Sequence, residues 1–118
     1  MVDTINKEEL EAAQNESEND ISKFSITLRK PIEYNGRAIE TLSFDFDKLT
    51  GADGLNIEAE LQATGKVVIA PVMSSEYLVR MAAKACNENI GADIFDVMSL
   101  KEFNKIRSAA RSFLLASE

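Results

Sequence analysis

The chain has 118 residues, 45% of them apolar and 28% charged, with a net charge of −7, no histidine and one cysteine. This composition is typical of one soluble domain with a modest core, and it excludes an internal disulfide and any imidazole-based triad, proton shuttle or ordinary zinc site. No stretch reaches the roughly 18 consecutive apolar residues of a membrane span, and residues 1–10 lack the order of a signal peptide. We therefore expect a cytosolic protein that does not act at a membrane.

Negative charge is concentrated at the start of the chain. Residues 1–20 hold seven acidic residues and one lysine, a net charge of −6, so the rest of the chain carries only −1. A nearly neutral body with an acidic leader does not attract a phosphate backbone, which argues against nucleic acid as a direct partner. The leader also has few large apolar residues, so we expect residues 1–21 to be disordered and residues 22–118 to form a single domain. The alternative is a short helix over residues 7–14 that forms on a partner.

Two segments of alternating apolar and polar residues, 24–28 and 42–46, predict an antiparallel β-hairpin. We favour a three-residue loop ending at Gly36 over a two-residue loop of Asn35 and Gly36, because only the longer loop places both apolar sets on one face with a single register. Pro31 donates no ladder hydrogen bond and indicates an edge or an irregular strand. The predicted pairs are Leu28 with Leu42, Ile26 with Phe44, Phe24 with Phe46, Lys30 with Glu40 and Glu33 with Arg37.

A helix is expected next, over residues 52–63. Thr50 and Asp53 have the spacing of a capping box, and Gly65 suits the left-handed residue that ends a helix. The apolar run at residues 66–73 follows and is broken by a proline. It is either a short buried strand or a packed connection, because periodicity alone does not distinguish them.

Two further helices complete the predicted α+β fold. Ser74 or Ser75 can cap a helix that ends near Gly91, and residues 92–98 form one brief helical turn. Ser99 begins a full capping box, which opens the third helix. The third helix carries its apolar residues at Leu100, Phe103, Ile106, Ala110, Phe113 and Leu114.

The sequence patterns for catalysis or ligand binding are incomplete. Gly65 and Lys66 lack the first glycine and the hydroxyl residue of a phosphate-binding loop. Asp45 and Asp47 would share one strand face and could hold a hard cation, but a solvated strand face is the favoured interpretation. Cys86 lies on an apolar stripe without a basic neighbour on its own face, which favours a packed thiol over a nucleophile. We expect no enzymatic activity, no bound metal and no cofactor.

The order of the motifs resembles a known family. The motifs are the strand of residues 24–32, the turn of residues 34–37, the strand of residues 39–44, the helix start at residues 47–53 and the closing helix of residues 100–114. Together they resemble the small tail assembly chaperones of long-tailed phages and prophages. The resemblance implies a non-enzymatic protein of the host bacterial cytoplasm that binds the tape measure protein, keeps its apolar helices soluble, helps recruit tail tube subunits and is absent from the finished virion.

A chaperone of this kind needs adaptable apolar surface, flanked by charge that keeps the complex soluble. We expect the second and third helices to share their apolar faces between the core and a groove for a partner helix; the alternative is that these residues are all core. The acidic leader could cover that surface until a partner displaces it. The candidate partner-binding residues are Tyr77, Met81, Phe103, Phe113 and Leu114.

Other classes of protein remain open at this point. A minor tail or head-completion protein of a phage particle would fit a small α+β body equally well. A small metal-dependent enzyme that uses Asp45 and Asp47 is a third reading. A homo-oligomer is compatible with any of these functions.

Overall fold

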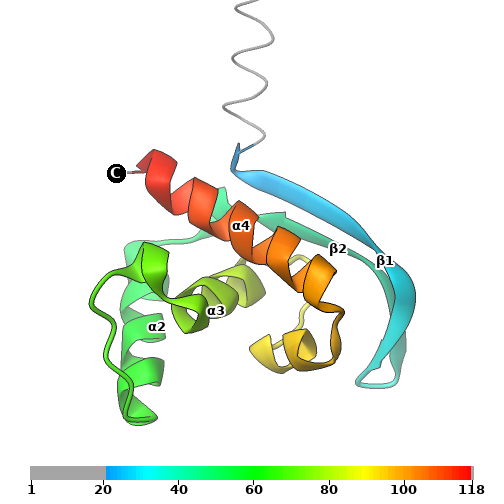
Figure 1. Ribbon diagram of the computed structural model, residues 1–118, viewed down its shortest axis with the longest axis horizontal. Helices are drawn as coiled ribbons and strands as arrows, with labels where there is room; N and C mark the ends of the chain where they lie inside the picture. The colour runs from blue at the N-terminus through cyan, green and yellow to red at the C-terminus, as the bar shows by residue number, and fades with distance from the viewer. Residues whose placement is uncertain (1–20, 118) are drawn as a thin grey trace, which may run out of the picture.

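The computed structural model describes residues 21–117. The predicted disorder of the acidic leader therefore lies outside the described residues, except at Ile21. The predicted α+β fold, a β-hairpin followed by helices, is confirmed (Figure 1). The elements are β1 (Lys23–Tyr34), β2 (Arg37–Asp45), the 3-10 turn η1 (Phe46–Lys48), α2 (Gly51–Ala63), the 3-10 turn η2 (Pro71–Met73), α3 (Ser75–Ala85), the 3-10 segment η3 (Ala92–Val97) and α4 (Leu100–Ser117).

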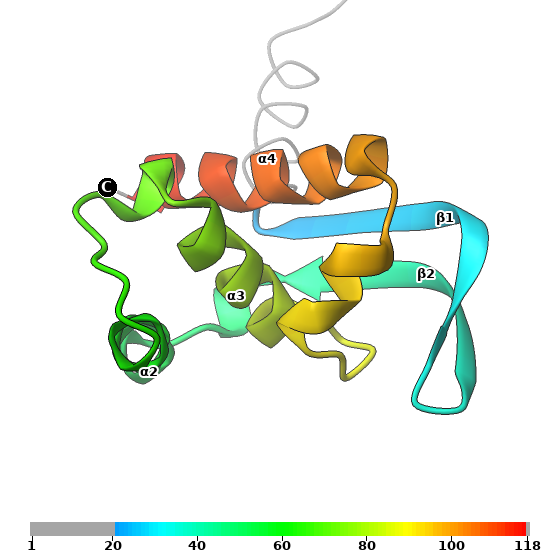
Figure 2. The same cartoon turned by 60° about the horizontal axis from the view of Figure 1, so that its bottom comes forward.

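The helices gather on one face of the curved hairpin (Figures 1 and 2). Helix α3 packs between α2 and α4, and it also contacts β2, while α4 contacts β1. Strand β2 alternates near its end as the period-two pattern predicts: Leu42 and Phe44 are buried, whereas Thr41 is exposed and Ser43 is half-buried. The largest fully buried side chains are Leu42, Phe44, Phe46, Ile57, Leu61, Leu78, Ile94 and Ile106.

The predicted register of the hairpin is wrong. The strands turn through a two-residue loop, in which Asn35 and Gly36 both have positive φ angles of 50° and 77°. Next to this loop, Ile32 pairs with Ile39. At the open end Phe24 pairs with Phe44 and Ile26 pairs with Leu42, instead of the predicted pairs of Phe24 with Phe46, Ile26 with Phe44 and Leu28 with Leu42. The predicted pairs of Lys30 with Glu40 and Glu33 with Arg37 are replaced as well, since Glu33 pairs with Ala38 and Tyr34 with Arg37.

An irregular segment of β1 explains the difference. The register shifts between Thr27 and Ile32, so that four residues of β1, 28–31, lie opposite the single residue Glu40. An odd shift of register moves side chains to the other face of a sheet, so this bulge brings both ends of the hairpin onto the core face despite the short loop. The irregularity includes Pro31, as the sequence predicts.

The predicted beginnings of the helices are confirmed. The Thr50 side chain accepts from the Asp53 backbone N–H, and the Asp53 carboxylate accepts from the Thr50 N–H at 2.8 Å, which completes the capping box of α2. At the other end of α2, Gly65 has a φ of 80° and Lys66 N–H donates to the Leu61 carbonyl at 3.0 Å. This is the hydrogen bond of a Schellman motif, which requires a left-handed residue before it. Ser74, not Ser75, caps α3.

Helix α3 ends earlier than predicted, at Ala85 instead of near Gly91. The chain leaves the helix because Cys86 forms an isolated antiparallel bridge with Phe44, and Asn87 N–H donates to the Ser43 carbonyl at 2.8 Å. These contacts satisfy backbone groups along the outer edge of β2, which a longer helix would leave unpaired.

The predicted capping box at the start of α4 forms, with one difference in the bonds that the Glu102 carboxylate makes. The Glu102 N–H donates to Ser99 Oγ at 3.2 Å, as a capping box requires. One oxygen of the Glu102 carboxylate accepts from the Ser99 hydroxyl, and the other accepts from the Arg29 backbone N–H at 2.7 Å. The carboxylate therefore joins the start of α4 to the bulge of β1. Within residues 21–117, no helix is both long enough and apolar enough to cross a membrane.

Candidate binding surface

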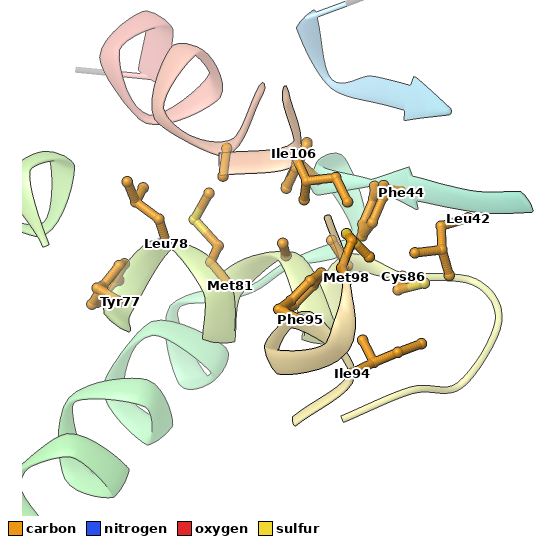
Figure 3. Packing of buried hydrophobic residues seen from close by; sticks show 14 of the residues in the cluster. Leu42, Phe44, Tyr77, Leu78, Met81, Cys86, Ile94, Phe95, Met98 and Ile106 are labelled. Atoms are coloured by element: carbon orange, nitrogen blue, oxygen red, sulfur yellow. The ribbon is translucent and has the colours of Figure 1, made fainter. Parts of the chain in front are cut away.

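The five predicted partner-binding residues occupy two different environments. Tyr77 and Met81 belong to the core, where they are only 7% and 3% exposed (Figure 3). Phe103, Phe113 and Leu114 are half-buried and pack against the edge of that core. The latter three are accessible in part to a partner, whereas contact with Tyr77 or Met81 requires the core to open.

Aromatic contacts hold the half-buried rings of α4 in place. Phe113 stacks on Phe46 with ring centroids 5.4 Å apart, and Phe103 lies 6.3 Å from Phe95. The Arg107 guanidinium carbon lies 5.2 Å from the centre of the Phe103 ring, within the range of a cation–π contact. The half-buried rings therefore pack α4 against η1 and η3.

Large apolar side chains are far more exposed at the α2–α3 connection and at the end of α4. We call these residues the apolar rim. The connection starts at the end of α2 that lies away from α4 and leads to η2, which lies beside α4 (Figures 1 and 2). Several such side chains in one short connection differ from the isolated exposed leucines of an ordinary surface and make the connection the candidate contact surface. The apolar rim comprises Val67 at 84% exposure, Ile69 at 93%, Met73 at 77% and Leu115 at 56%.

Polar contacts from α4 position the rim. Arg111 Nε donates to the Val72 carbonyl at 2.9 Å, which fixes η2 against α4. Leu115 follows Arg111 by one helical turn and so lies on the same face of the helix, next to η2. Arg107 extends the same contact to the start of α3 by donating to Ser75 Oγ at 3.0 Å. The end of the connection is thus held against α4 and α3, while Val67, Ile69 and Met73 stay exposed.

Residues 66–73 are not the buried strand of the first alternative. They form a connection that is packed only in part, because residues 68 and 70–72 are half-buried whereas Val67, Ile69 and Met73 are exposed. Only Val68 of its first apolar residues packs against the core. The Schellman motif at Gly65 redirects the chain, and Pro71 then begins η2. The run itself was the signal for the rim, but an apolar run indicates burial unless the number of elements available to cover it is known.

A pocket of about 490 Å³ lies between α3 and the segment that follows it. Three cations and one carboxylate border it, and each makes a hydrogen bond within the fold. The Glu60 carboxylate accepts from Arg80 and from Lys84, each at 3.0 Å, and the hydrogen bond from Lys84 is the main reason that the pKa of Glu60 lies below its ordinary value. Lys48 Nζ donates to the Cys86 carbonyl and to Asn87 Oδ1. These bonds join α2 to α3 and η1 to the segment after α3, so each charged side chain that borders the pocket has a partner within the fold.

The two candidate metal-binding carboxylates do not share a strand face. Strand β2 ends at Asp45, whose carboxylate accepts from the Asp47 N–H at 3.2 Å and so caps η1. Asp45 also lies 3.6 Å from Lys23 Nζ. Among the residues from 21 to 117, no three acidic or cysteine side chains are grouped as metal ligands would be.

Cys86 is predicted to react very slowly with thiol reagents in the folded protein. Its side chain is 6% exposed, and burial raises the pKa of its thiol to about 12, so almost no thiolate is present at neutral pH. The rate of modification by a disulfide reagent should rise sharply when urea unfolds the chain. Rapid modification in native buffer would contradict this environment for Cys86.

Searches of protein-family models, of curated proteins and of solved structures find no match to this chain.

Proposed function

We propose that this chain is a non-enzymatic tail assembly chaperone of a long-tailed phage or prophage, which binds the tape measure protein and assists assembly of the tail tube in the host cytoplasm. The observation that supports the proposal most strongly is the apolar rim, with four large apolar side chains exposed along the α2–α3 connection and at the end of α4. An amphipathic partner helix recognises such a surface by laying its apolar face against it.

The composition of the rim suits a partner with many successive apolar helices. Met73 contributes a flexible thioether that adapts to different side-chain shapes. Leu114 and Phe113 continue the apolar surface from Leu115 toward the core, so a docked helix would cover half-buried and exposed residues together. The paired charges of Lys66 and Glu76, 2.6 Å apart, border the connection and keep its surroundings hydrated.

Serine substitutions in the rim test this proposal. Ile69→Ser, Met73→Ser and Leu115→Ser together should reduce co-purification with the co-expressed tape measure protein at least tenfold, because a loss of about 1.4 kcal/mol in binding already gives that factor. The unfolding midpoint should change little, since all three side chains are exposed.

The matched control is Leu55→Ser, which removes an equally large apolar side chain that is 68% exposed on α2. It should leave co-purification unchanged. Undiminished binding by the triple variant would remove the rim from the interface. Finding the protein in purified particles would instead favour a minor structural component of the tail or head.

A further inference from the structure

Four lysine and arginine side chains among residues 21–117 differ from the others in their contacts. Eight of the twelve lysine and arginine side chains between residues 21 and 117 donate a hydrogen bond or form an ion pair, among them Lys48, Arg80 and Arg111. The remaining four make neither contact with any described residue and lie on β1 or the first half of α4. These four are Arg29, Lys30, Lys101 and Lys105.

Positive and negative charges are unevenly distributed over the described residues, and the excess of positive charge lies on the two elements that carry these four cations. Strand β1 and helix α4 together carry seven cations and two carboxylates, a net charge of +5. The other described residues carry five cations and ten carboxylates, a net charge of −5. Arg107 and Arg111 contribute to this charge but bond toward α3 and η2, so the cations that can serve the contact of β1 with α4 are the four without such bonds (Figure 2).

Two hollows follow the line where β1 meets α4, which we call the β1–α4 seam. One is a shallow groove of about 460 Å³ bordered by Phe24, Lys105 and Ala109. The second, of about 560 Å³, lies beyond the bulge of β1 and is bordered by Pro31 and Val97. Each hollow combines apolar side chains with at least one of the four cations, so an acidic segment with a few apolar residues matches the seam.

We propose that residues 1–20 of this chain lie along the β1–α4 seam. This segment has a net charge of −6 and carries apolar side chains at Val2, Ile5 and Leu10. It joins the described body at Ile21, immediately before β1, where the Ser22 carbonyl accepts from the Phe46 N–H at 2.7 Å. The positive seam therefore begins where the acidic segment ends.

The length of the segment and its covalent link to the body favour it over a separate molecule as the occupant of the seam. Twenty residues extend over at most about 70 Å, whereas ten residues of strand β1 span only about 33 Å. Covalent linkage raises the effective concentration of the segment at the seam to the millimolar range, so even a weak contact is populated. The inference does not depend on the proposed function, because it concerns contacts within one chain.

A spin label in the leader tests the proposal in the full-length chain. Asn6→Cys places a nitroxide 15 residues before Ile21, and the buried Cys86 stays unlabelled under native conditions. We expect the label to broaden the amide signals of residues 24–30 and 101–112. The broadening should be lost in about 1 M NaCl, where the Debye length is about 3 Å.

A charge variant and its control make the test specific. Lys101→Gln with Lys105→Gln removes two exposed charges and keeps good helix-forming residues, so α4 stays intact while the broadening is lost. Lys48→Gln with Lys66→Gln removes the same charge away from the seam and should leave the broadening unchanged. Broadening confined to the residues near Ile21, or insensitive to salt, would overturn the proposal.

A mixture of two kinds of chain distinguishes contact within one chain from contact between two chains. Isotope-labelled chains without the nitroxide are combined with unlabelled chains that carry it. The proposal predicts no broadening in this mixture. Broadening of the seam in the mixture would show that a second copy supplies the segment and would overturn docking within one chain.

Discussion

Replacing Met81 with alanine is expected to lower the free energy of unfolding by about 2–5 kcal/mol, as for other buried methionines and leucines. Met81 is 3% exposed and lies in the core with Leu78 and Ile106 (Figure 3). The substitution removes its buried carbon and sulfur contacts and leaves a cavity that close-packed neighbours fill only in part. Urea-induced unfolding followed by circular dichroism measures the effect.

Met73 provides the matched control, because it is the same residue type at 77% exposure. Met73→Ala should change the free energy of unfolding by no more than about 0.5 kcal/mol. The pair separates a structural methionine from one that is available to a partner. Equal effects of the two substitutions would contradict the assignment of Met81 to the core and of Met73 to the apolar rim.

Replacing Glu88 with alanine is expected to destabilise the fold by about 2–3 kcal/mol, the range for a lost charge-assisted hydrogen bond and an orphaned donor. The Glu88 carboxylate accepts from the Ser43 N–H and the Ser43 hydroxyl, both at 2.7 Å, and from Cys86 Sγ at 3.3 Å. It thereby joins the segment after α3 to the outer edge of β2. Without it, the part-buried Ser43 N–H has to find another acceptor.

The contribution of Glu88 should depend on pH. Burial disfavours its charged form, but the hydrogen bonds from Ser43 and Cys86 outweigh burial and lower the pKa of Glu88 from its ordinary value of 4.5. A carboxyl group with a lowered pKa in the folded state stabilises the fold above its unfolded pKa, and this stabilisation is lost as the pH falls through the folded value.

Glu88→Gln measures this pH dependence with little change of shape. The difference in unfolding free energy between the wild-type protein and this variant should be largest near pH 7 and shrink below pH 4.5. Glu58→Gln, at an exposed position on α2, serves as the control. If the difference in unfolding free energy between wild type and Glu88→Gln stays constant down to acidic pH, the ionised carboxylate of Glu88 does not stabilise the contact between β2 and the segment after α3.

Local signals in the sequence predicted the helix boundaries well. The capping residues Thr50, Ser74 and Ser99 act on backbone groups within three residues, so their effect does not depend on the rest of the fold. The early end of α3 could not be predicted in this way. It depends on the pairing of Cys86 with Phe44, which is 42 residues earlier in the chain.

The register of the hairpin could not be predicted from local sequence signals either. The alternation of apolar residues correctly identified which side chains of β2 face the core, including Leu42 and Phe44. The prediction assumed one register along the whole hairpin and therefore rejected the loop of Asn35 and Gly36. The bulge at residues 28–31 satisfies both the loop and the core, and its stabilising bond from Arg29 to Glu102 is a contact with a distant helix.

The candidate surface was only partly accessible to sequence reasoning. The apolar stripes of α3 and α4 were identified, but helical spacing does not reveal which side of a stripe is covered. Packing of α3 between α2 and α4 buries Tyr77 and Met81, and the contact of Phe113 with Phe46 half-buries that ring. The most exposed residues, Val67 and Ile69, lie in a connection for which no covering element exists among residues 21–117.

Oxidative footprinting of the methionines in the free protein and in its complex with the tape measure protein tests the central claim most directly. Met73 should form its sulfoxide readily in the free protein and several times more slowly in the complex, while buried Met81 reacts slowly in both. This result would place the partner on the apolar rim. Equal oxidation of Met73 with and without a bound partner would contradict the account.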